Sequence, residues 1–286
     1  MDSIAWRSAQ TACPHALPVA YGTTPMNSAD TLPGERQQAI LQLLREHGRV
    51  LATPLALQFG VSEDSIRRDL RDLAQRGLCR RVHGGALPLT PTFPPLAERQ
   101  QQDLPRKQAL AELAAGLVRH GELIALDAGS TNSAIAAMLP RHLQLRVVTN
   151  APDIALLLMA RQGIEVSLIG GRLDRRSGGV LGSQAMECLA GLHVDVCFAG
   201  TCAIDSEGTA WAVDGEEAAF KRALVRCADR VVVVASNEKL GAIASHWIAS
   251  REQVDVLLLE ADAPAALVDA LRLQGLDVIV SAAPSI

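Results

Sequence analysis

Residues 55–86 read LALQFGVSEDSIRRDLRDLAQRGLCRRVHGGA, and this stretch decides the fold of the first part of the chain. Within it, Ser62 is placed to cap a helix, because a serine side chain accepts a hydrogen bond from the free N–H groups of the turn that follows. Ile66, Leu70 and Leu73 then recur at helical spacing and predict one buried face. The other positions of this helix are mostly charged.

Two helices are expected before this one, and a hairpin after it. ERQQAILQLLREHG (35–48) carries an apolar stripe, and the TPLALQFG stretch has Thr53 as a candidate N-cap and Gly60 as its stop. LCRRVHGGAL (78–87) predicts two short strands around a Gly-Gly turn. Three helices followed by a small hairpin predict a winged helix-turn-helix domain over residues 35–87.

Charge is distributed unevenly along the chain. Residues 35–86 hold nine Arg against six Asp and Glu, a balance of +3, whereas the whole chain carries −4 and the remainder therefore −7. A basic segment on an acidic body is typical of DNA-binding modules. The charged helix is then either an ordinary solvated face or a surface that meets DNA. Asp69 and Asp72, which lie between its Arg residues, are expected to orient them or to face solvent.

Hydroxyls and Arg near a helix N-terminus are what contacts to bases and phosphates need. The two Arg that begin the hairpin are placed to reach adjacent phosphates, and His83 either touches the DNA backbone or only orders the turn. The predicted contacts to double-stranded DNA are Ser62, Asp64, Ser65, Arg67, Arg68, Arg71, Arg80, Arg81 and His83.

The segments that flank this domain have a different composition. Residues 1–34 are rich in Ser, Thr, Ala and Pro without periodicity, and we expect a disordered extension, with Met26 as an alternative start. PLTPTFPPLA (88–97) contains four prolines and begins a stiff linker that we place over residues 88–105. No stretch reaches the ~18 apolar residues of a membrane span, and the N-terminus lacks a signal-peptide pattern. We expect a soluble cytoplasmic protein whose six cysteines are buried or half-buried thiols.

Residues 106–286 alternate apolar strands with helices, beginning with a helix over Lys107–Arg119. Near-continuous apolar strands separated by helices predict a Rossmann-like parallel α/β sheet that is covered on both faces. The expected strands are LIALD (123–127), LRVVTN (145–150), EVSLIGG (165–171), VDVCFAG (194–200), RVVVVAS (230–236), VDVLLLE (254–260) and DVIVS (277–281).

Ligands of such sheets bind beyond the carboxyl ends of the strands. There, Asp127-Ala-Gly-Ser-Thr131 opens a helix and offers backbone N–H groups, two hydroxyls and a positive dipole end. It is either an anion cradle or a tight strand-to-helix turn. The chain has only three lysines among its abundant arginines, and we expect them mainly where a compact ammonium group is required. Lys239 comes after a strand, and Lys221 is either a pocket residue or half of a Glu217–Lys221 surface pair.

The sequence also excludes several classes of site. No G-x-S-x-G, H-E-x-x-H, P-loop or G-x-G-x-x-G motif occurs, and no Cys and His cluster has zinc spacing. We therefore predict no catalytic residue, no metal site and no cofactor.

These motifs, in this order, resemble the DeoR family of bacterial transcriptional regulators. The helix-turn-helix segment is similar almost throughout, and LDAGSTN, VVTN, LIGGRL, VLG, EEAAFKRA and ASNEKLG resemble successive motifs of the family's sensor domain. The resemblance covers roughly residues 35–260. It implies a ribose-phosphate-isomerase-like sensor fold and a repressor of carbohydrate metabolism that responds to a phosphorylated sugar or related metabolite.

Carried over by motif, the effector-binding residues are expected in the sensor domain, over residues 106–286. They are Asp127, Gly129, Ser130, Thr131, Asn150, Gly170, Gly171, Arg172, Glu217, Lys221 and Lys239. The third lysine, Lys107, matches the one that opens the family's sensor.

The chain departs from the family on the expected ligand side. GTCAID places Cys202 and Ala203 where the family often has Asp and Gly, ASNEK has Ser236 in place of an acid, and AWAVD replaces a T-T-P-N segment. A different effector and weaker binding are the two open consequences.

The first hypothesis is therefore a dimeric or tetrameric repressor that a phosphorylated metabolite releases from its operator. The second is a sugar-phosphate isomerase-like enzyme with a vestigial helix-turn-helix, in which Asp127, Glu217 and Lys239 act as acid–base groups. The third is a metabolite-binding adaptor that uses the helix-turn-helix for protein contacts. The Arg-bearing helix favours the first.

Overall fold

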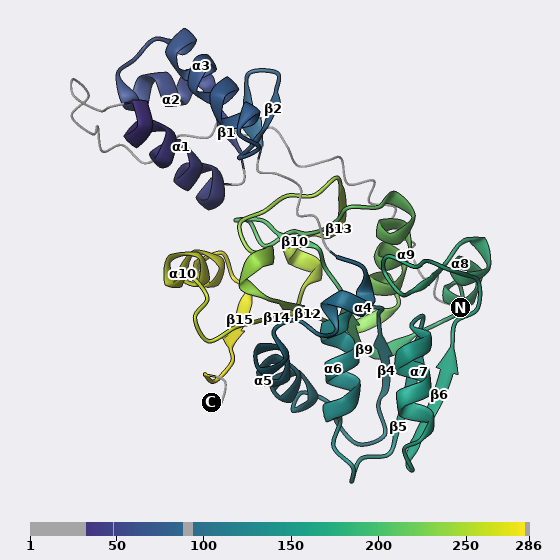
Figure 1. The fold of residues 1–286 in the computed structure, drawn as a ribbon. Coiled ribbons are helices and arrows are strands. Elements are labelled where there is room, and N and C mark those ends of the chain that lie inside the picture. The colour runs from purple at the N-terminus through teal and green to yellow at the C-terminus, as the bar shows by residue number, and fades with distance from the viewer. Residues whose placement is uncertain (1–32, 48, 88–93, 284–286) are drawn as a thin grey trace, which may run out of the picture.

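The computed structural model describes residues 33–47, 49–87 and 94–283 (Figure 1). The expected disordered extension lies outside the described residues up to residue 32, and so does the proline-rich stretch over 88–93. Among the described helices, none is long and apolar enough to cross a membrane.

The N-terminal part is a winged helix-turn-helix, as the sequence predicts. Its apolar core unites the three helices with the hairpin and includes Ile40, Leu55, Ile66, Leu70 and Leu73. The elements are α1 (Pro33–His47), β1 (Val50–Leu51), α2 (Ala52–Phe59), α3 (Glu63–Gln75), β2 (Arg80–Val82) and β3 (Gly85–Leu87), and the strands pair in the order β1-β3-β2.

Two local features of this domain differ from the sequence prediction. Thr53 is not the N-cap of α2, because the helix already begins at Ala52 and the Thr53 hydroxyl instead donates to Glu63 Oε1, 2.6 Å away. Strand β1 was not predicted, since two residues are too few to show an alternating pattern. Gly85 makes its pairing possible: a Cβ at this position would lie 1.9 Å from the Val50 carbonyl oxygen.

The C-terminal part is built on one seven-stranded sheet in which every pairing is parallel, as expected. The strand order is β15-β14-β12-β9-β4-β5-β6. The strands are β4 (Leu123–Leu126), β5 (Leu145–Thr149), β6 (Ile164–Leu168), β9 (Val194–Ala199), β12 (Ala228–Ala235), β14 (Val256–Leu259) and β15 (Asp277–Val280).

Alternate residues of the central strands enter two separate cores, whereas the edge strand β6 contributes to one of them only. Ile124 and Leu126 of β4 pack with α5 (Leu104–Ala115), α6 (Ser130–Met138) and α7 (Pro152–Met159). Ala125, between them, faces the other core with α8 (Ser183–Leu189), α9 (Gly215–Arg226) and α10 (Ala265–Leu273). Both faces of the sheet are therefore covered, which explains the continuous apolar strands.

Shorter elements complete the domain. A three-stranded antiparallel sheet is formed in the order β10-β11-β13, and β7 pairs with β8. Their bounds are β7 (Arg172–Leu173), β8 (Val180–Leu181), β10 (Ala203–Ile204), β11 (Ala210–Ala212), β13 (His246–Ala249), η1 (Asn237–Lys239) and η2 (Arg251–Gln253).

The expected linker over 88–105 is partly structured. It contains α4 (Leu96–Arg99) and the beginning of α5, which starts at Leu104 and ends at Ala115 rather than spanning Lys107–Arg119. Pro105 stands in the first turn of α5, where its missing N–H costs nothing. Pro95, directly before α4, and Pro105 therefore both stand at helix starts.

The topology fixes where a ligand can enter. The chain runs outward from β4 through β5 and β6, then returns to place β9 on the other side of β4 and runs outward again. The carboxyl ends of β4 and β9 therefore diverge at a topological switch point, where open α/β sheets form their binding crevice.

Candidate effector pocket and nucleic-acid interface

The N-terminal half of α3 has an exposed, polar outer face. Ser62 caps the helix by accepting a hydrogen bond from Ser65 N at 3.2 Å. Arg67 is held by Glu63 at 2.8 Å and by Asp64 at 3.5 Å, and all three side chains are substantially exposed. The neighbouring Arg68 and Arg71, also predicted DNA contacts, are exposed as well.

Asp69 behaves differently from the other acids of α3. It is buried and pairs with Arg36 of α1, whose Nε lies 2.6 Å from its carboxylate. Of the two roles expected from the sequence, it therefore orients an arginine, but one on another helix. This ion pair links α3 to α1. Asp69 therefore does not pair with the arginines on the outer face of α3.

The predicted wing residues are likewise on the surface. Arg80 and Arg81 lie in β2, His83 follows in the turn, and all three are exposed. The interpretation of His83 as a residue that orders the turn gains no support from the hydrogen bonds of the described residues. Its contact to DNA stays a prediction.

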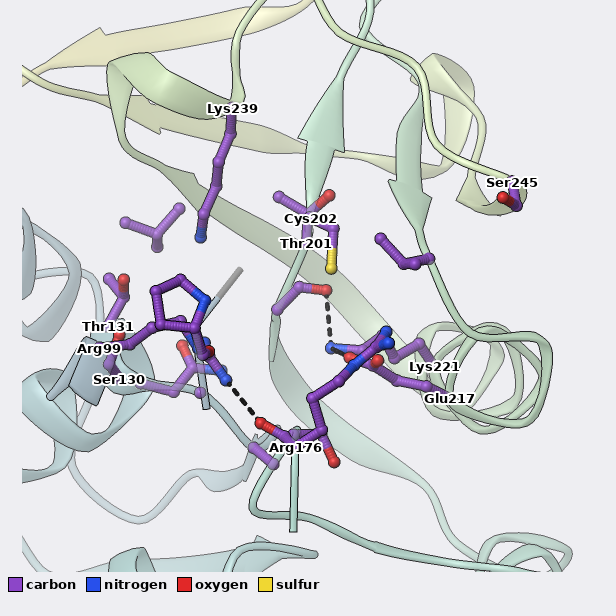
Figure 2. A pocket seen from close by; sticks show the side chains of 18 residues that line it. Arg99, Ser130, Thr131, Arg176, Thr201, Cys202, Glu217, Lys221, Lys239 and Ser245 are labelled. Atoms are coloured by element: carbon purple, nitrogen blue, oxygen red, sulfur yellow. Dashed lines mark hydrogen bonds and ion pairs between the residues drawn. The ribbon is translucent and has the colours of Figure 1, made fainter. Parts of the chain in front are cut away.

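In the C-terminal domain, a cavity of about 400 Å³ opens at the switch point (Figure 2). Its walls come from the loop and helix after β4, the loop after β9, the first turns of α9, and η1 after β12. It brings together six of the predicted effector-binding residues: Gly129, Ser130, Thr131, Glu217, Lys221 and Lys239.

A buried ion-pair cluster forms the floor. Lys221 Nζ lies 2.5 Å from Asp127 Oδ2, 3.2 Å from Glu217 Oε1 and 3.0 Å from the Gly200 carbonyl oxygen. Burial lowers the pKa of Lys221, but the two carboxylates outweigh this effect and raise it. Lys221 is thus a charged, buried pocket residue, and its interpretation as half of a surface pair is wrong.

Asp127 is fully engaged by these contacts. Besides Lys221, its carboxylate accepts hydrogen bonds from Gly200 N at 2.9 Å and from Ala128 N at 2.8 Å. Asp127 therefore links the ends of β4 and β9 beneath the cavity and does not line it.

One wall is the N-terminal end of α6. Ser130 and Thr131 are nearly buried, and they begin a helix whose first N–H groups have no partner within the helix. Across the cavity, the Lys239 side chain reaches inward from η1 (Figure 2). Burial, together with the charges of Arg99 and Lys221, lowers the pKa of Lys239 to about 8. A helix N-terminus facing a lysine suits an anionic group.

Besides Asp127, four predicted effector-binding residues lie outside the cavity lining. Asn150 is buried and fixes the loop after β4, since its Oδ1 accepts from Ala128 N at 2.9 Å. Arg172 is exposed and pairs with Glu216. Gly170 packs on Gln184, and Gly171 allows close approach of the Leu181 carbonyl oxygen. Their part in effector binding stays a prediction. Asn150 supports the site indirectly, by holding the loop after β4.

Several lining residues were missed by the sequence analysis. They include two cations, Arg99 and Arg176, and Pro94, which lies two residues before α4. Arg99 belongs to the expected linker, and Arg176 lies between β7 and β8, so no motif or strand end marked them. The remaining missed polar residues of the lining are Asn132, Ser177 and Ser245, whereas Cys202 belongs to the GTCAID stretch that was expected on the ligand side.

The cysteines are free thiols throughout the described residues. Cys79 and Cys197 are buried, and Cys202 and Cys227 are half-buried, but Cys188 is exposed, so the expectation of burial is wrong for it. Among the described residues, no group of three or more His, Cys, Asp or Glu is arranged to hold a metal.

Comparison with known proteins agrees with both halves of this description. A model of the DeoR-like helix-turn-helix domain matches residues 36–92, and a model of the DeoR C-terminal sensor domain matches residues 102–261. The glycerol-3-phosphate regulon repressor of Escherichia coli (strain K12) is 32% identical over 83% of this chain and 94% of its own length. The HTH-type transcriptional repressor GlcR of Bacillus subtilis (strain 168) is 30% identical over 86% of this chain and 96% of its own.

Solved structures resemble the chain more distantly. Ribose 5-phosphate isomerase A from Methanocaldococcus jannaschii has a TM-score of 0.37 and 19% identity, over 49% of this chain and 55% of its own. The eIF2B-beta2-delta2 complex from C. thermophilum has a TM-score of 0.40 and 12% identity, over 79% and 81%. The two domain matches and the full-length relatives decide the assignment: the chain belongs to the DeoR family, with a helix-turn-helix domain at its N-terminal end and a sensor domain at its C-terminal end.

Proposed function

We propose that this protein is a transcriptional repressor of carbohydrate-metabolism genes, which binds a double-stranded DNA operator through α3 and the β2–β3 wing. A phosphorylated sugar or a related phosphorylated metabolite enters the pocket of the sensor domain and releases the protein from the operator. The charge of the pocket supports the second half of this proposal.

The lining holds four cations, Arg99, Arg176, Lys221 and Lys239, against a single carboxylate, Glu217. Lys221 is already neutralised by Asp127 and Glu217. The Arg176 guanidinium makes no hydrogen bond or ion pair with any residue that the structure describes, and it points into the cavity (Figure 2). Cations of this kind, opposite the N-terminus of α6, match a phosphate ester.

The names of the relatives support a phosphorylated effector without naming it. One relative is a repressor of the glycerol-3-phosphate regulon. At its own pocket, this chain differs from the family pattern at two positions, Cys202 and Ala203. Cys202 lines the cavity and Ala203 begins β10. We therefore expect an effector that differs from those of the relatives in the part that lies near Cys202.

An isomerase-like enzyme is the alternative, and two of its three expected acid–base groups, Asp127 and Glu217, are already bound to Lys221. A general base must reach a substrate proton with a free lone pair. The Asp127 carboxylate is spent on Lys221 and two backbone N–H groups and is only 1% exposed. Glu217 lines the cavity but is bound to Lys221.

The proposed protein acts as a dimer or tetramer in the cytoplasm. Helix-turn-helix proteins commonly read two half-sites related by a two-fold axis, and one recognition helix is too small to select an operator alone. Sedimentation of the full chain, with and without promoter DNA, tests this part.

The central test is fluorescence anisotropy of the full chain on DNA from its own promoter region, titrated with a panel of sugar phosphates. We expect nanomolar, salt-dependent binding and release by one phosphorylated compound, but not by its dephosphorylated form. Absence of specific DNA binding would refute the repressor. Turnover of pentose or hexose phosphates by the same full chain would favour the enzyme.

A further inference from the structure

We infer that α4 is part of the effector site, and that Arg99 is the residue through which an anion in the pocket acts on the segment leading to the DNA-binding domain. This inference rests on the proposed function, because it specifies how that pocket is coupled to the operator. Three sets of contacts carry it.

The first is the position of α4 itself. Pro94, just before α4, and Arg99, its last residue, both line the cavity (Figure 2). Between them, Leu96 is buried against Gly178, where an added Cβ would lie 2.0 Å from the leucine side chain. Only six residues, 88–93, separate Pro94 from the end of β3 in the winged domain. The pocket and the DNA-binding domain therefore share one short segment of chain.

The second is the bonding of the Arg99 guanidinium. Its Nε donates to the Pro94 carbonyl oxygen at 3.0 Å, and its Nη2 donates to the Arg176 carbonyl oxygen at 3.4 Å. Both acceptors are neutral, and the second bond is long. A phosphate accepts a shorter and roughly twice as strong charge-assisted bond. An anion in the cavity is thus able to draw Arg99 away from Pro94.

The third is the unequal anchoring of the two ends of α4. At its C-terminal end, Lys107 Nζ donates to the Arg99 carbonyl oxygen and, at 2.6 Å, to that of Gln102. Gln100 donates to Asp153 at 2.8 Å, and the same carboxylate oxygen accepts from Ser133 of α6 at 2.7 Å. These contacts fix the end nearer the sensor.

At the N-terminal end, Leu96 packs on Gly178, but the described hydrogen bonds are fewer. The Leu96 amide donates to the Arg176 carbonyl oxygen at 3.2 Å, and Arg99 holds Pro94. Loss of the Arg99 contacts therefore loosens α4 at the end that continues toward the winged domain, while the sensor end stays fixed. The pocket thereby acts on the linker without any rearrangement of the sheet.

Hydrogen–deuterium exchange of the full chain tests this inference, with inorganic phosphate as the probe at tens of millimolar and chloride at equal ionic strength as the reference. In the wild-type protein, phosphate should slow exchange at residues 129–133 and accelerate it at the amides of Leu96–Arg99. Arg99→Gln should keep the first effect and lose the second. Arg175→Gln, which removes an exposed arginine outside the cavity lining, should behave as wild type.

The outcomes separate the inference from the proposed function. Slower exchange at 129–133 with no change over Leu96–Arg99 would overturn the inference alone, as would an unchanged response in Arg99→Gln. No effect of phosphate at either place would overturn both. If Arg99→Gln melts well below wild type, Arg99→Lys serves instead: it keeps the charge, lacks the planar fork that holds two carbonyls at once, and should show fast exchange over Leu96–Arg99 even without phosphate.

Discussion

Lys221 Nζ lies 2.5 Å from Asp127 Oδ2, and the two side chains are 4% and 1% exposed. Asp127 comes directly after β4, and Lys221 lies on α9, so the pair joins two elements that are far apart in the sequence. A buried ion pair of this kind is stabilising only while both charges are present, because each alone would be a desolvated ion without a partner.

Lys221→Met should therefore destabilise the sensor domain by about 3–5 kcal/mol, since it leaves Asp127 as a buried unpaired carboxylate. The measurement is urea unfolding of the full chain, followed by circular dichroism. Arg226→Met is the control, because Arg226 is exposed on the same helix. The double variant Lys221→Met/Asp127→Asn should recover part of the loss; equal stability of Lys221→Met and wild type would contradict a structural role for the pair.

The sequence predicts the sheet well because each strand has its own local signal. All seven parallel strands are apolar runs, and DAGST marks the end of β4 by the residue types that a strand-to-helix turn needs. The capped α3 and the Gly-Gly turn are equally local. Ser130, Thr131 and Lys239 could be placed at one edge because parallel strands end together. Lys221, which lies on a helix, was placed there by the family resemblance alone.

The parts that were missed depend on contacts between distant segments. Arg176 and Arg99 meet through a hydrogen bond between residues 77 positions apart. The burial of Asp69 follows from Arg36 on another helix, which no pattern within α3 reveals. Helix α4 has four residues, too few for a periodic signal, and it follows prolines that indicate a linker. Such features are fixed by tertiary packing alone.

The structure distinguishes the arginines of α3 in DNA binding. Arg68→Ala should weaken operator binding by about 1–3 kcal/mol if its guanidinium contacts a base. Arg67→Ala should cost less, because its guanidinium is already bound by Glu63 and Asp64 and must be released before it can contact DNA. Anisotropy titrations on promoter DNA at several salt concentrations measure both.

Arg76→Ala provides the comparison within the same helix. Arg76 caps the opposite end of α3 and donates to Gln37 at 3.1 Å. We expect operator affinity within twofold of wild type for this variant, and unchanged effector binding to the sensor for all three. Wild-type operator binding by both Arg67→Ala and Arg68→Ala would mean that the outer face of α3 is an ordinary solvated surface.

Effector binding should depend on pH through Lys239. Burial lowers its pKa to about 8, so the side chain loses its charge as the pH rises through 8. A bound anion favours the charged form and raises this pKa, which means that binding takes up a proton. The dissociation constant for an anionic effector should therefore increase steadily above pH 8 and vary little from this group below pH 7.

Calorimetric titrations from pH 6.5 to 9.5, in buffers of different ionisation enthalpy, measure both the affinity and the proton uptake. Lys239→Arg is the matched variant, because arginine keeps its charge over this range. It should remove the alkaline loss of affinity. If the affinity of Lys239→Arg for the effector falls above pH 8 as steeply as that of wild type, the titration belongs to another group.

The fit between Leu96 and Gly178 predicts a coupled pair of substitutions. Gly178 has φ of 77°, and a Cβ there would meet Leu96 Cδ2 at 2.0 Å, so Gly178→Ala must both strain the backbone and displace the side chain that docks α4. Gly191→Ala is the control, because a Cβ at Gly191 has no neighbour within 4 Å. It should change stability by less than about 0.5 kcal/mol.

Unfolding free energies of Gly178→Ala, Leu96→Ala and the double variant separate the cost of backbone strain from the cost of the steric clash with Leu96. With Leu96 shortened, the steric part of the Gly178→Ala cost disappears and only the backbone strain remains. The stability lost by the double variant should therefore be smaller than the sum of the two single losses by about 0.5–3 kcal/mol. Because the displaced element is α4, Gly178→Ala should also accelerate hydrogen exchange over Leu96–Arg99 in the absence of any anion, as a bound phosphate is expected to do. Strictly additive losses with unchanged exchange would show that Leu96 does not dock α4 through this contact.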